Sequence, residues 1–220
     1  MKTKVIGLIQ LKGGVGRSTV ATNLAGELSR TKPVCLIDCD VPQDTSTSWY
    51  SVRRAKKPSQ NLTAYRVSNG QDLLDFVDKE AGKYKYVILD SPPRITDIGR
   101  AIALVSDLII VPVGASSAEI WASEDVKVML GQAGEVKGAP LDAHLLWTRY
   151  KDYTVLSREI HDEAEKFMGI PSLETTLGYR QAYIEALGSG LTAGETKDKK
   201  AQLEVASLCV EVKKLLKQGE

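Results

Sequence analysis

The sequence predicts an α/β fold, with a mostly parallel, twisted sheet that carries helices on both of its faces. Short continuous apolar runs alternate with helix-like stretches, which is the pattern of a parallel sheet buried on both sides. A glycine-rich loop directly follows the first of these runs. Hydrophobic residues make up 43% of the 220 residues and charged residues 26%, which excludes a disordered or fibrous chain. We expect a single domain over residues 1–220.

Each apolar run is expected to form a strand, and each stretch with helical spacing a helix. The runs are too short to span a membrane, which needs ~18 apolar residues. Helical spacing is clearest in residues 18–30, where Val20, Leu24 and Leu28 share one face. In chain order we expect a strand at 5–9, a helix at 18–30, a strand at 34–37, a short helix around 73–76, a strand at 86–89, a helix at 101–105, a strand at 108–113, a helix at 119–130, a strand at 143–147, and helices at 155–168 and 201–217.

Charge and cysteine content narrow the class of protein. The chain has 29 Lys and Arg against 28 Asp and Glu, so any site for a polyanion must be a local patch. Its three cysteines, Cys35, Cys39 and Cys209, contain no C-x-x-C pair, which favours a reducing, cytoplasmic compartment. With only two histidines besides, the sequence does not indicate a Cys/His metal site.

The glycine-rich loop is typical of a phosphate-binding loop. It follows a predicted strand and opens a predicted helix, so backbone N–H groups and the helix dipole would converge on an anion. The hydroxyl of Ser18 suits Mg²⁺, a cation that prefers oxygen ligands. A glycine-rich turn without a ligand is the alternative. The candidate phosphate-binding residues are Lys12, Gly13, Gly14, Val15, Gly16, Arg17, Ser18 and Thr19.

Three aspartates stand at or just beyond the ends of predicted strands: Asp38, Asp40 and Asp90. Carboxyl ends of parallel strands meet at one edge of the sheet, which is where ligands bind in such folds. A single aspartate at this place more often caps a helix or forms a turn. Three of them on adjacent strands, beside a phosphate loop, favour a magnesium-dependent phosphoryl-transfer site.

The loop resembles the deviant Walker A motif, K-G-G-x-G-K-[ST], of the ParA/MinD family of P-loop ATPases. Lys12, Gly13, Gly14, Gly16 and Ser18 match this motif. Other segments resemble the family's D-x-D-P-Q switch, its Walker B strand with the D-x-P-P turn, and the strand and loop after it. These are residues 38–43, 87–93, 107–113, 117–122 and 177–186. The phosphate loop begins within a dozen residues of Met1, as in the small ParA proteins of plasmid partition and carboxysome positioning.

The resemblance implies an ATPase that uses ATP and Mg²⁺, releases ADP, and forms a nucleotide-sandwich homodimer. Lys12 would reach the partner's phosphates, and Asp40 would orient the attacking water. Ser18, Asp38 and Asp90 would hold Mg²⁺ directly or through its waters. Relatives contact adenine with an Asn that this chain lacks, which leaves Thr148 or Arg149 for that role. Such proteins sit on the nucleoid, bind DNA without sequence preference, and position a plasmid, chromosome region or large assembly through an adaptor that stimulates hydrolysis.

The chain departs from the family pattern at two places. Arg17 stands where the family has the central lysine of its phosphate loop. Arginine keeps the charge, but its wide planar group is a poor substitute for a compact ammonium in a tight loop. We therefore expect slow hydrolysis. Val41 adds one residue to the switch.

A basic region outside the phosphate loop is predicted to contact DNA. Residues 45–71 contain no Asp or Glu but carry a charge of +5. The plainer interpretation is a solvated helix face. A further basic group is Arg149 and Arg158, with Arg180 nearby by topology. The full set of candidate DNA contacts is Arg53, Arg54, Lys56, Lys57, Arg149, Arg158 and Arg180.

Competing functions remain open at this point. Residues 201–217 form an amphipathic helix, but Glu204 and Glu211 interrupt its basic face, so core packing is favoured over membrane binding. A nucleotide-dependent binding protein that does not hydrolyse ATP is an alternative that Arg17 supports. A metabolic enzyme built on the same phosphate loop is another.

Overall fold

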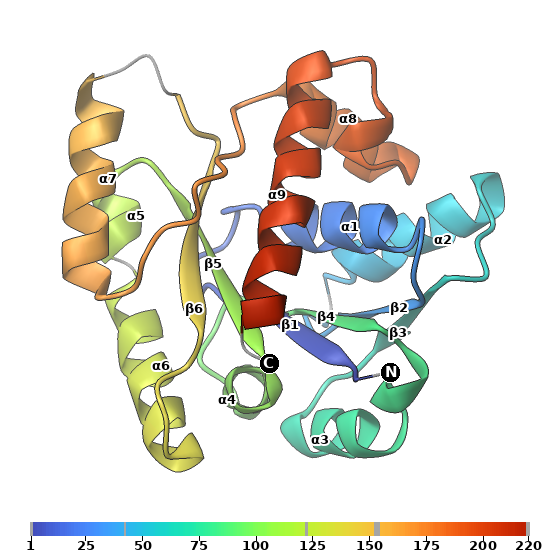
Figure 1. The fold of residues 1–220 in the computed structure, drawn as a ribbon, viewed down its shortest axis with the longest axis horizontal. Coiled ribbons are helices and arrows are strands. Elements are labelled where there is room, and N and C mark those ends of the chain that lie inside the picture. The colour runs from blue at the N-terminus through green and yellow to red at the C-terminus, as the bar shows by residue number, and fades with distance from the viewer. Residues whose placement is uncertain (1, 42, 122, 152–154, 219–220) are drawn as a thin grey trace.

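The computed structural model describes residues 2–41, 43–121, 123–151 and 155–218, with the backbone only at 117, 155–158 and 162. A six-stranded parallel sheet lies at its centre, with strands in the order β3-β2-β4-β1-β5-β6. Helices flank this sheet on both sides (Figure 1). The predicted fold class is therefore confirmed.

The strands are β1 (Lys4–Leu8), β2 (Val34–Asp38), β3 (Leu62–Arg66), β4 (Tyr86–Asp90), β5 (Leu108–Gly114) and β6 (Ala143–Thr148). All strands predicted from apolar runs are present, with ends within one residue of the expected bounds. β3 was missed because it is an edge strand. Only its first residue, Leu62, is buried, so its sequence contains no apolar run.

The helices are α1 (Arg17–Leu28), α2 (Thr45–Lys56), α3 (Gly70–Lys79), α4 (Asp97–Val105), α5 (Ser117–Trp121), α6 (Glu124–Lys137), α7 (Val155–Met168), α8 (Gln181–Ser189) and α9 (Lys199–Gln218). One short turn of 3-10 helix, Ala81–Lys83, follows α3, and another, Ala193–Glu195, precedes α9. The single helix expected at 119–130 is wrong, because α5 and α6 are separate. Between them Ser123 is buried, and its hydroxyl lies 2.9 Å from the Glu119 carbonyl and 2.8 Å from Gln10 Nε2.

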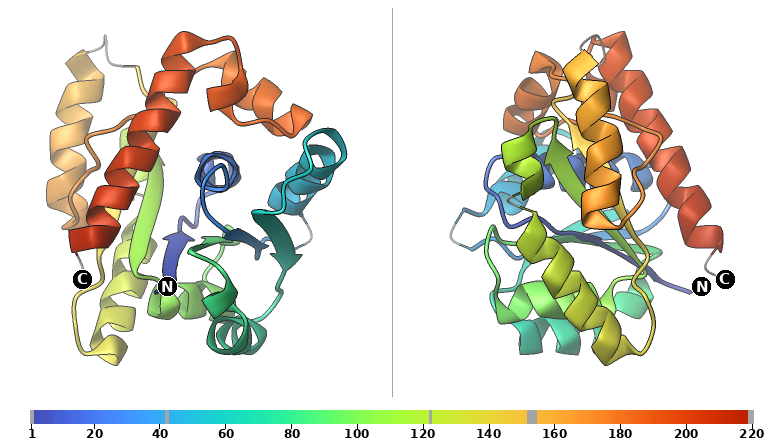
Figure 2. Two further views of the ribbon diagram at one scale, coloured as in Figure 1. Left: turned by 45° about the vertical axis from the view of Figure 1, so that its right-hand side comes forward. Right: turned by 90° about the vertical axis from the view of Figure 1, so that its left-hand side faces the viewer.

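The helices form two layers with separate apolar cores. α1, α2, α8 and α9 contribute buried side chains to one face of the sheet, and α3, α4, α6 and α7 to the other (Figure 2). Trp49 of α2 and Trp147 of β6 are the largest fully buried side chains, one in each core. Both layers leave the carboxyl ends of the strands to loops, and that edge holds the candidate site.

The last helix packs on the core, as expected. In α9, Val205, Leu208, Val212 and Leu216 are buried, although Leu203, also expected on the apolar face, is 68% exposed. Within the described residues no helix combines the length and the apolar character that a membrane crossing requires.

Candidate functional site

The loop between β1 and α1 forms an open cradle. Gly14 and Gly16 adopt positive φ values of 77° and 93°, which glycine accepts without a steric penalty. Gly16 is also the N-cap of α1, and as a glycine it has no side chain that could bond the first N–H groups of the helix. The first N–H groups of α1 are therefore free to bind an anion. The hollow above them has a volume of about 410 Å³ and is lined by the loop from Gly13 to Thr19, together with Asp40, Gln43, Thr45 and Pro93.

Arg17 lies beneath this cradle rather than above it. Its side chain is only 7% exposed. Nε donates to the Ser91 carbonyl at 3.0 Å, and Nη1 donates to the carbonyls of Gln10 and, at 2.7 Å, Lys12. Burial lowers the pKa of Arg17, and the charges of Asp90 and Asp40 oppose this effect. Arg17 thus connects the end of β1, the phosphate loop and the turn after β4. Its Nη2 is not bonded to these carbonyls and lies on the side of Asp40.

Asp38 and Asp90 are paired in register on neighbouring strands and both are fully buried. Asp38 accepts hydrogen bonds from the backbone N–H groups of Thr47, at 2.9 Å, and Asp40, at 3.2 Å. Its carboxylate therefore anchors the start of α2, in addition to any role toward a metal. Burial raises the pKa of Asp38, and the bonds from Thr47 and Asp40 counter it.

Asp90 has a free oxygen that fits the predicted cation. Its Oδ2 accepts a hydrogen bond from the Ser46 hydroxyl at 2.6 Å, whereas Oδ1 is buried without a partner among the described atoms. Burial raises the pKa of Asp90 to about 6, although Ser46 and Ser18 stabilise the charged form. A buried, unpaired carboxylate oxygen beside a serine hydroxyl is a donor set suited to hydrated Mg²⁺. No group of three or more His, Cys, Asp and Glu side chains that could hold a metal by itself occurs in the described part.

Asp40 and Lys12 lie on opposite sides of the loop. Asp40 Oδ2 is 3.8 Å from Arg17 Nη2 and lines the hollow. Lys12 does not line it, because its ammonium lies 3.5 Å from Glu119 Oε1. Glu119 also accepts a 2.8 Å hydrogen bond from Arg149 and one of 2.7 Å from the Gly114 N–H. Sequence reasoning gave Glu119 no role, and its only signal was its place in the segment after β5.

Thr148 holds the loop instead of offering its hydroxyl to a base. Its Oγ1 is 2.8 Å from the Val15 carbonyl and 3.2 Å from the Val113 carbonyl. Arg149 has a positive φ of 52° and directs its guanidinium to Glu119. Both still line a pocket of 220 Å³ that adjoins the cradle, between the loop and the segment 177–187. The Thr148 hydroxyl thus has a structural role in the loop, and the adenine contact by Thr148 or Arg149 stays a prediction.

The family that the sequence matches is consistent with a nucleotide site at the cradle. The model of the CobQ/CobB/MinD/ParA nucleotide-binding domain matches residues 6–193. The chain belongs to this family. It is 26% identical to maintenance of carboxysome distribution protein A of Halothiobacillus neapolitanus over 87% of both chains. It is 28% identical to the chromosome-partitioning ATPase Soj of Thermus thermophilus over 88% of both chains.

Solved structures show the same fold at lower identity. The ATP complex of a Cyanothece McdA variant has a TM-score of 0.78 and 16% identity, with 96% of each chain covered. The cell division ATPase MinD of Pyrococcus furiosus has a TM-score of 0.78 and 17% identity, covering 97% of this chain and 100% of that chain.

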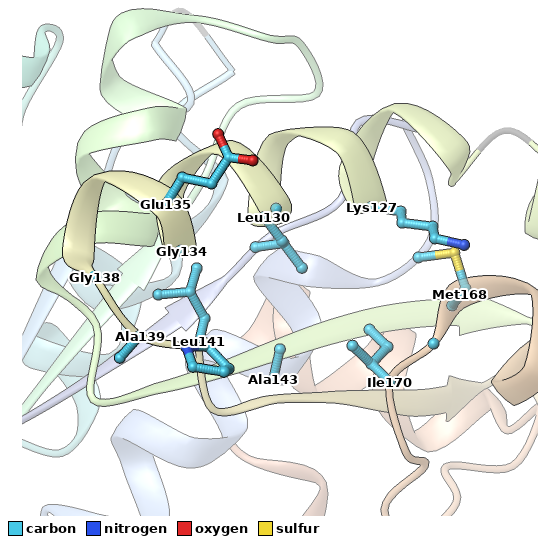
Figure 3. Close-up of a pocket in the computed structure, with 13 residues that line it drawn as sticks. Lys127, Leu130, Gly134, Glu135, Gly138, Ala139, Leu141, Ala143, Met168 and Ile170 are labelled. Atoms are coloured by element: carbon cyan, nitrogen blue, oxygen red, sulfur yellow. The ribbon is translucent and has the colours of Figure 1, made fainter.

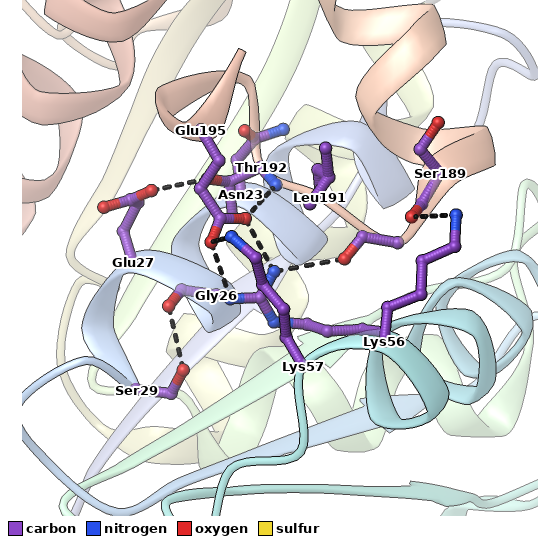
Figure 4. A network of polar contacts seen from close by, with 12 residues as sticks. Asn23, Gly26, Glu27, Ser29, Lys56, Lys57, Ser189, Leu191, Thr192 and Glu195 are labelled. Atoms are coloured by element: carbon purple, nitrogen blue, oxygen red, sulfur yellow. Dashed lines mark hydrogen bonds and ion pairs between the residues drawn. The ribbon is translucent and has the colours of Figure 1, made fainter.

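The basic run predicted to contact DNA is partly engaged within this ParA/MinD-family chain. Arg53 is buried, and its Nη1 lies 2.7 Å from Glu195 and 3.1 Å from the Gly190 carbonyl. Figure 4 shows Lys56, Lys57 and Glu195 in the same network. Lys57 donates to the same Glu195 at 3.0 Å. Lys56 donates to the Ser189 carbonyl at 3.2 Å. Arg53 is therefore not part of an exposed basic surface, because its charge is neutralised inside the protein.

The remaining predicted DNA contacts include both paired and exposed arginines. Arg180 is bound to Glu204 through Nε at 2.9 Å and Nη2 at 2.6 Å. Arg149 is bound to Glu119. The Arg158 side chain lies outside the described residues. Arg54 and Lys56 are the exposed members of the run for which the described part of the chain shows no acidic partner.

Another hollow lies away from the phosphate loop. It has a volume of about 580 Å³ between α6 and the segments that flank β6, as Figure 3 shows. Its walls are mainly apolar or glycine, and the Lys127 ammonium beside it donates to the Phe167 carbonyl at 2.7 Å. It offers none of the phosphate-binding features of the family site.

Proposed function

We propose that this chain is a ParA-type ATPase that dimerises with ATP and Mg²⁺, binds DNA without sequence preference, and positions a cargo through an adaptor protein. It would act in the cytoplasm on the nucleoid. The observation that carries the proposal is Lys12. The chain's own cradle is built from backbone N–H groups, and the Lys12 ammonium lies outside it, beside Glu119. The Lys12 side chain is 39% exposed, so Lys12 would exchange Glu119 for the phosphates of a second protomer.

The residues of one protomer suffice for the other parts of the reaction. The loop N–H groups from Gly13 to Thr19 would bind the phosphates. Mg²⁺, held by Ser18 and by Asp90 through water, would neutralise charge on the phosphates. Asp40 lines the same hollow and would hold the attacking water. The names of the relatives, a carboxysome distribution protein and a chromosome-partitioning ATPase, support a cargo that must be moved or segregated.

The test of the dimer is light scattering with and without ATP and Mg²⁺. The native chain should change from monomer to dimer, and Lys12→Ala should stay monomeric while folding normally. Lys79→Ala is a matched control, because Lys79 is an exposed lysine on α3 that pairs with Asp75, away from the phosphate loop. A Lys12→Ala protein that dimerises as well as the control would overturn the proposal.

The position of Arg17 supports the inference that hydrolysis is slow. It also supports a second candidate function, a nucleotide-dependent binding protein that does not hydrolyse ATP. The guanidinium gives Nε and Nη1 to protein carbonyls, which leaves one edge for phosphate and Asp40. ATPase assays with and without DNA separate the candidates. Slow turnover that Asp40→Ala abolishes supports the ATPase, and ATP-dependent dimerisation with no turnover supports the binding protein.

A further inference from the structure

A second basic surface lies at the opposite edge of the sheet, where the parallel strands begin. It is a hollow of about 320 Å³ near the start of β1 and the end of α9, which lie at the same end of the molecule (Figures 1 and 2). We call it the lysine hollow. The lysines that line it are Lys4, Lys32, Lys85, Lys213 and Lys217.

The lysines come from elements that are far apart in the sequence. Lys32 lies in the turn before β2, and Lys85 immediately precedes β4. Lys213 and Lys217 lie on the last turns of α9. A lysine near the end of a helix interacts favourably with the helix dipole, which accounts for Lys217 alone. The dipole gives no reason for Lys32 and Lys85 to face the same hollow.

The charge of the lysine hollow is not compensated by its own walls. Among the described residues, no aspartate or glutamate lines it. Within the described chain, Lys32, Lys213 and Lys217 form no ion pair with an acidic side chain, and the Lys85 ammonium donates to the Lys2 carbonyl at 3.1 Å. This contrasts with the basic run of α2, where Glu195 neutralises Arg53 and Lys57.

We propose that the lysine hollow binds the phosphate backbone of DNA; this rests on the proposed function and moves its DNA surface away from α2. Ammonium groups on flexible stems contact phosphates as point charges. The lining contains no Arg, Asn or Gln, the side chains that read base edges in pairs of hydrogen bonds. Binding through this surface is therefore independent of sequence.

The shape of the surface favours a polymer over other anions. Its lysines come from four separate segments, so several phosphates of a polymer can be contacted at once. A lipid membrane would require apolar groups to insert. The large apolar side chains of the lining, Tyr86 and Leu216, are 7% and 5% exposed and are part of the core. A dimer formed through the phosphate-loop edges would carry two such hollows, so ATP would strengthen DNA binding by linking them.

The experiment compares two double variants of equal charge. Lys32→Gln/Lys217→Gln removes charge from the lysine hollow, and Arg54→Gln/Lys56→Gln removes the same charge from α2. DNA affinity of the ATP-bound protein is measured on two unrelated duplexes at several salt concentrations. The hollow variant should bind both duplexes more weakly by the same factor, and its log–log salt slope should fall by about 0.9 for each lost contact. The α2 variant should match the native protein.

Several results would decide against the proposal. If the native dimer binds DNA and only the α2 variant weakens it, the proposed function stands and the lysine hollow is not the DNA surface. If the native dimer forms but binds no DNA, both fail. Preferential binding to phosphatidylglycerol vesicles over DNA also overturns the proposal. So does the loss of DNA binding when millimolar inorganic phosphate is added at constant ionic strength, because a small anion would then occupy the hollow. Lys32→Arg/Lys217→Arg should retain binding, and melting temperatures of all variants exclude unfolding as the cause.

Discussion

Two arginines, Arg17 at the phosphate loop and Arg53 in α2, are both buried. The sequence predicted that each would contact phosphate, of nucleotide or of DNA, but in the fold they bond different acceptors. Arg53 pairs with the Glu195 carboxylate and stacks beside Trp49, 5.3 Å from the ring centre. Arg17 binds neutral backbone carbonyls, and its nearest acidic contact, to Asp40, is 3.8 Å long. The charge of Arg53 is thus neutralised within the protein, whereas that of Arg17 still acts on the nucleotide site. A sequence therefore shows where a positive charge lies along the chain, but not which acceptor that charge meets in the folded protein.

The largest effect is expected from Arg53→Met. This change leaves the Glu195 carboxylate without its main partner, and breaking such a pair costs about 3 kcal/mol of unfolding free energy. Arg54→Met is the matched control, because Arg54 is exposed and should change stability by less than about 0.5 kcal/mol. Urea denaturation measures both. Equal stability of the two variants would show that Arg53 is not a structural residue.

A smaller loss is expected from Arg17→Met without nucleotide. The carbonyls of Gln10, Lys12 and Ser91 lose their donor, but the nearby open hollow lets water reach part of the site. We expect a cost of about 2 kcal/mol. Thermal denaturation of the nucleotide-free protein measures it, and a melting temperature unchanged from the native one would contradict the hydrogen bonds described for Arg17.

The smallest effect concerns pH. Burial alone would raise the pKa of Glu195, but bonds from Arg53, the Thr192 N–H and Lys57 lower it to about 2, against an ordinary value of 4.5. The stabilisation is therefore complete above pH 4.5 and is lost as the pH falls from there toward 2. Denaturation midpoints between pH 6 and pH 3 should fall more steeply for the native protein than for Glu195→Gln. Parallel curves would refute the lowered pKa.

The parts of the molecule that the sequence predicted depend on local patterns. Five strands follow from apolar runs, and the phosphate loop follows from closely spaced glycines between a strand and a helix. β3 escaped because four of its five residues are not fully buried. α2 escaped because its polar start and basic end obscure the helical repeat.

The parts that could not be predicted depend on contacts between distant residues. Arg17 and Ser91 are 74 positions apart, and Arg53 and Glu195 are 142 apart. The lysine hollow gathers side chains from positions 4 to 217. Only the fold brings these groups together, so the acid-free run of 45–71 was visible in the sequence and the lysine hollow was not.

Single-turnover hydrolysis of ATP by the native protein and by Arg17→Lys tests the central claim most directly. If the carbonyls of Gln10, Lys12 and Ser91 hold the guanidinium away from its family role, a lysine that reaches the phosphates should raise the rate. Misplacing a reacting group by about 1 Å costs ~10²-fold, which sets the size of the expected gain. An Arg17→Lys protein that binds ATP normally and hydrolyses it no faster would contradict the account.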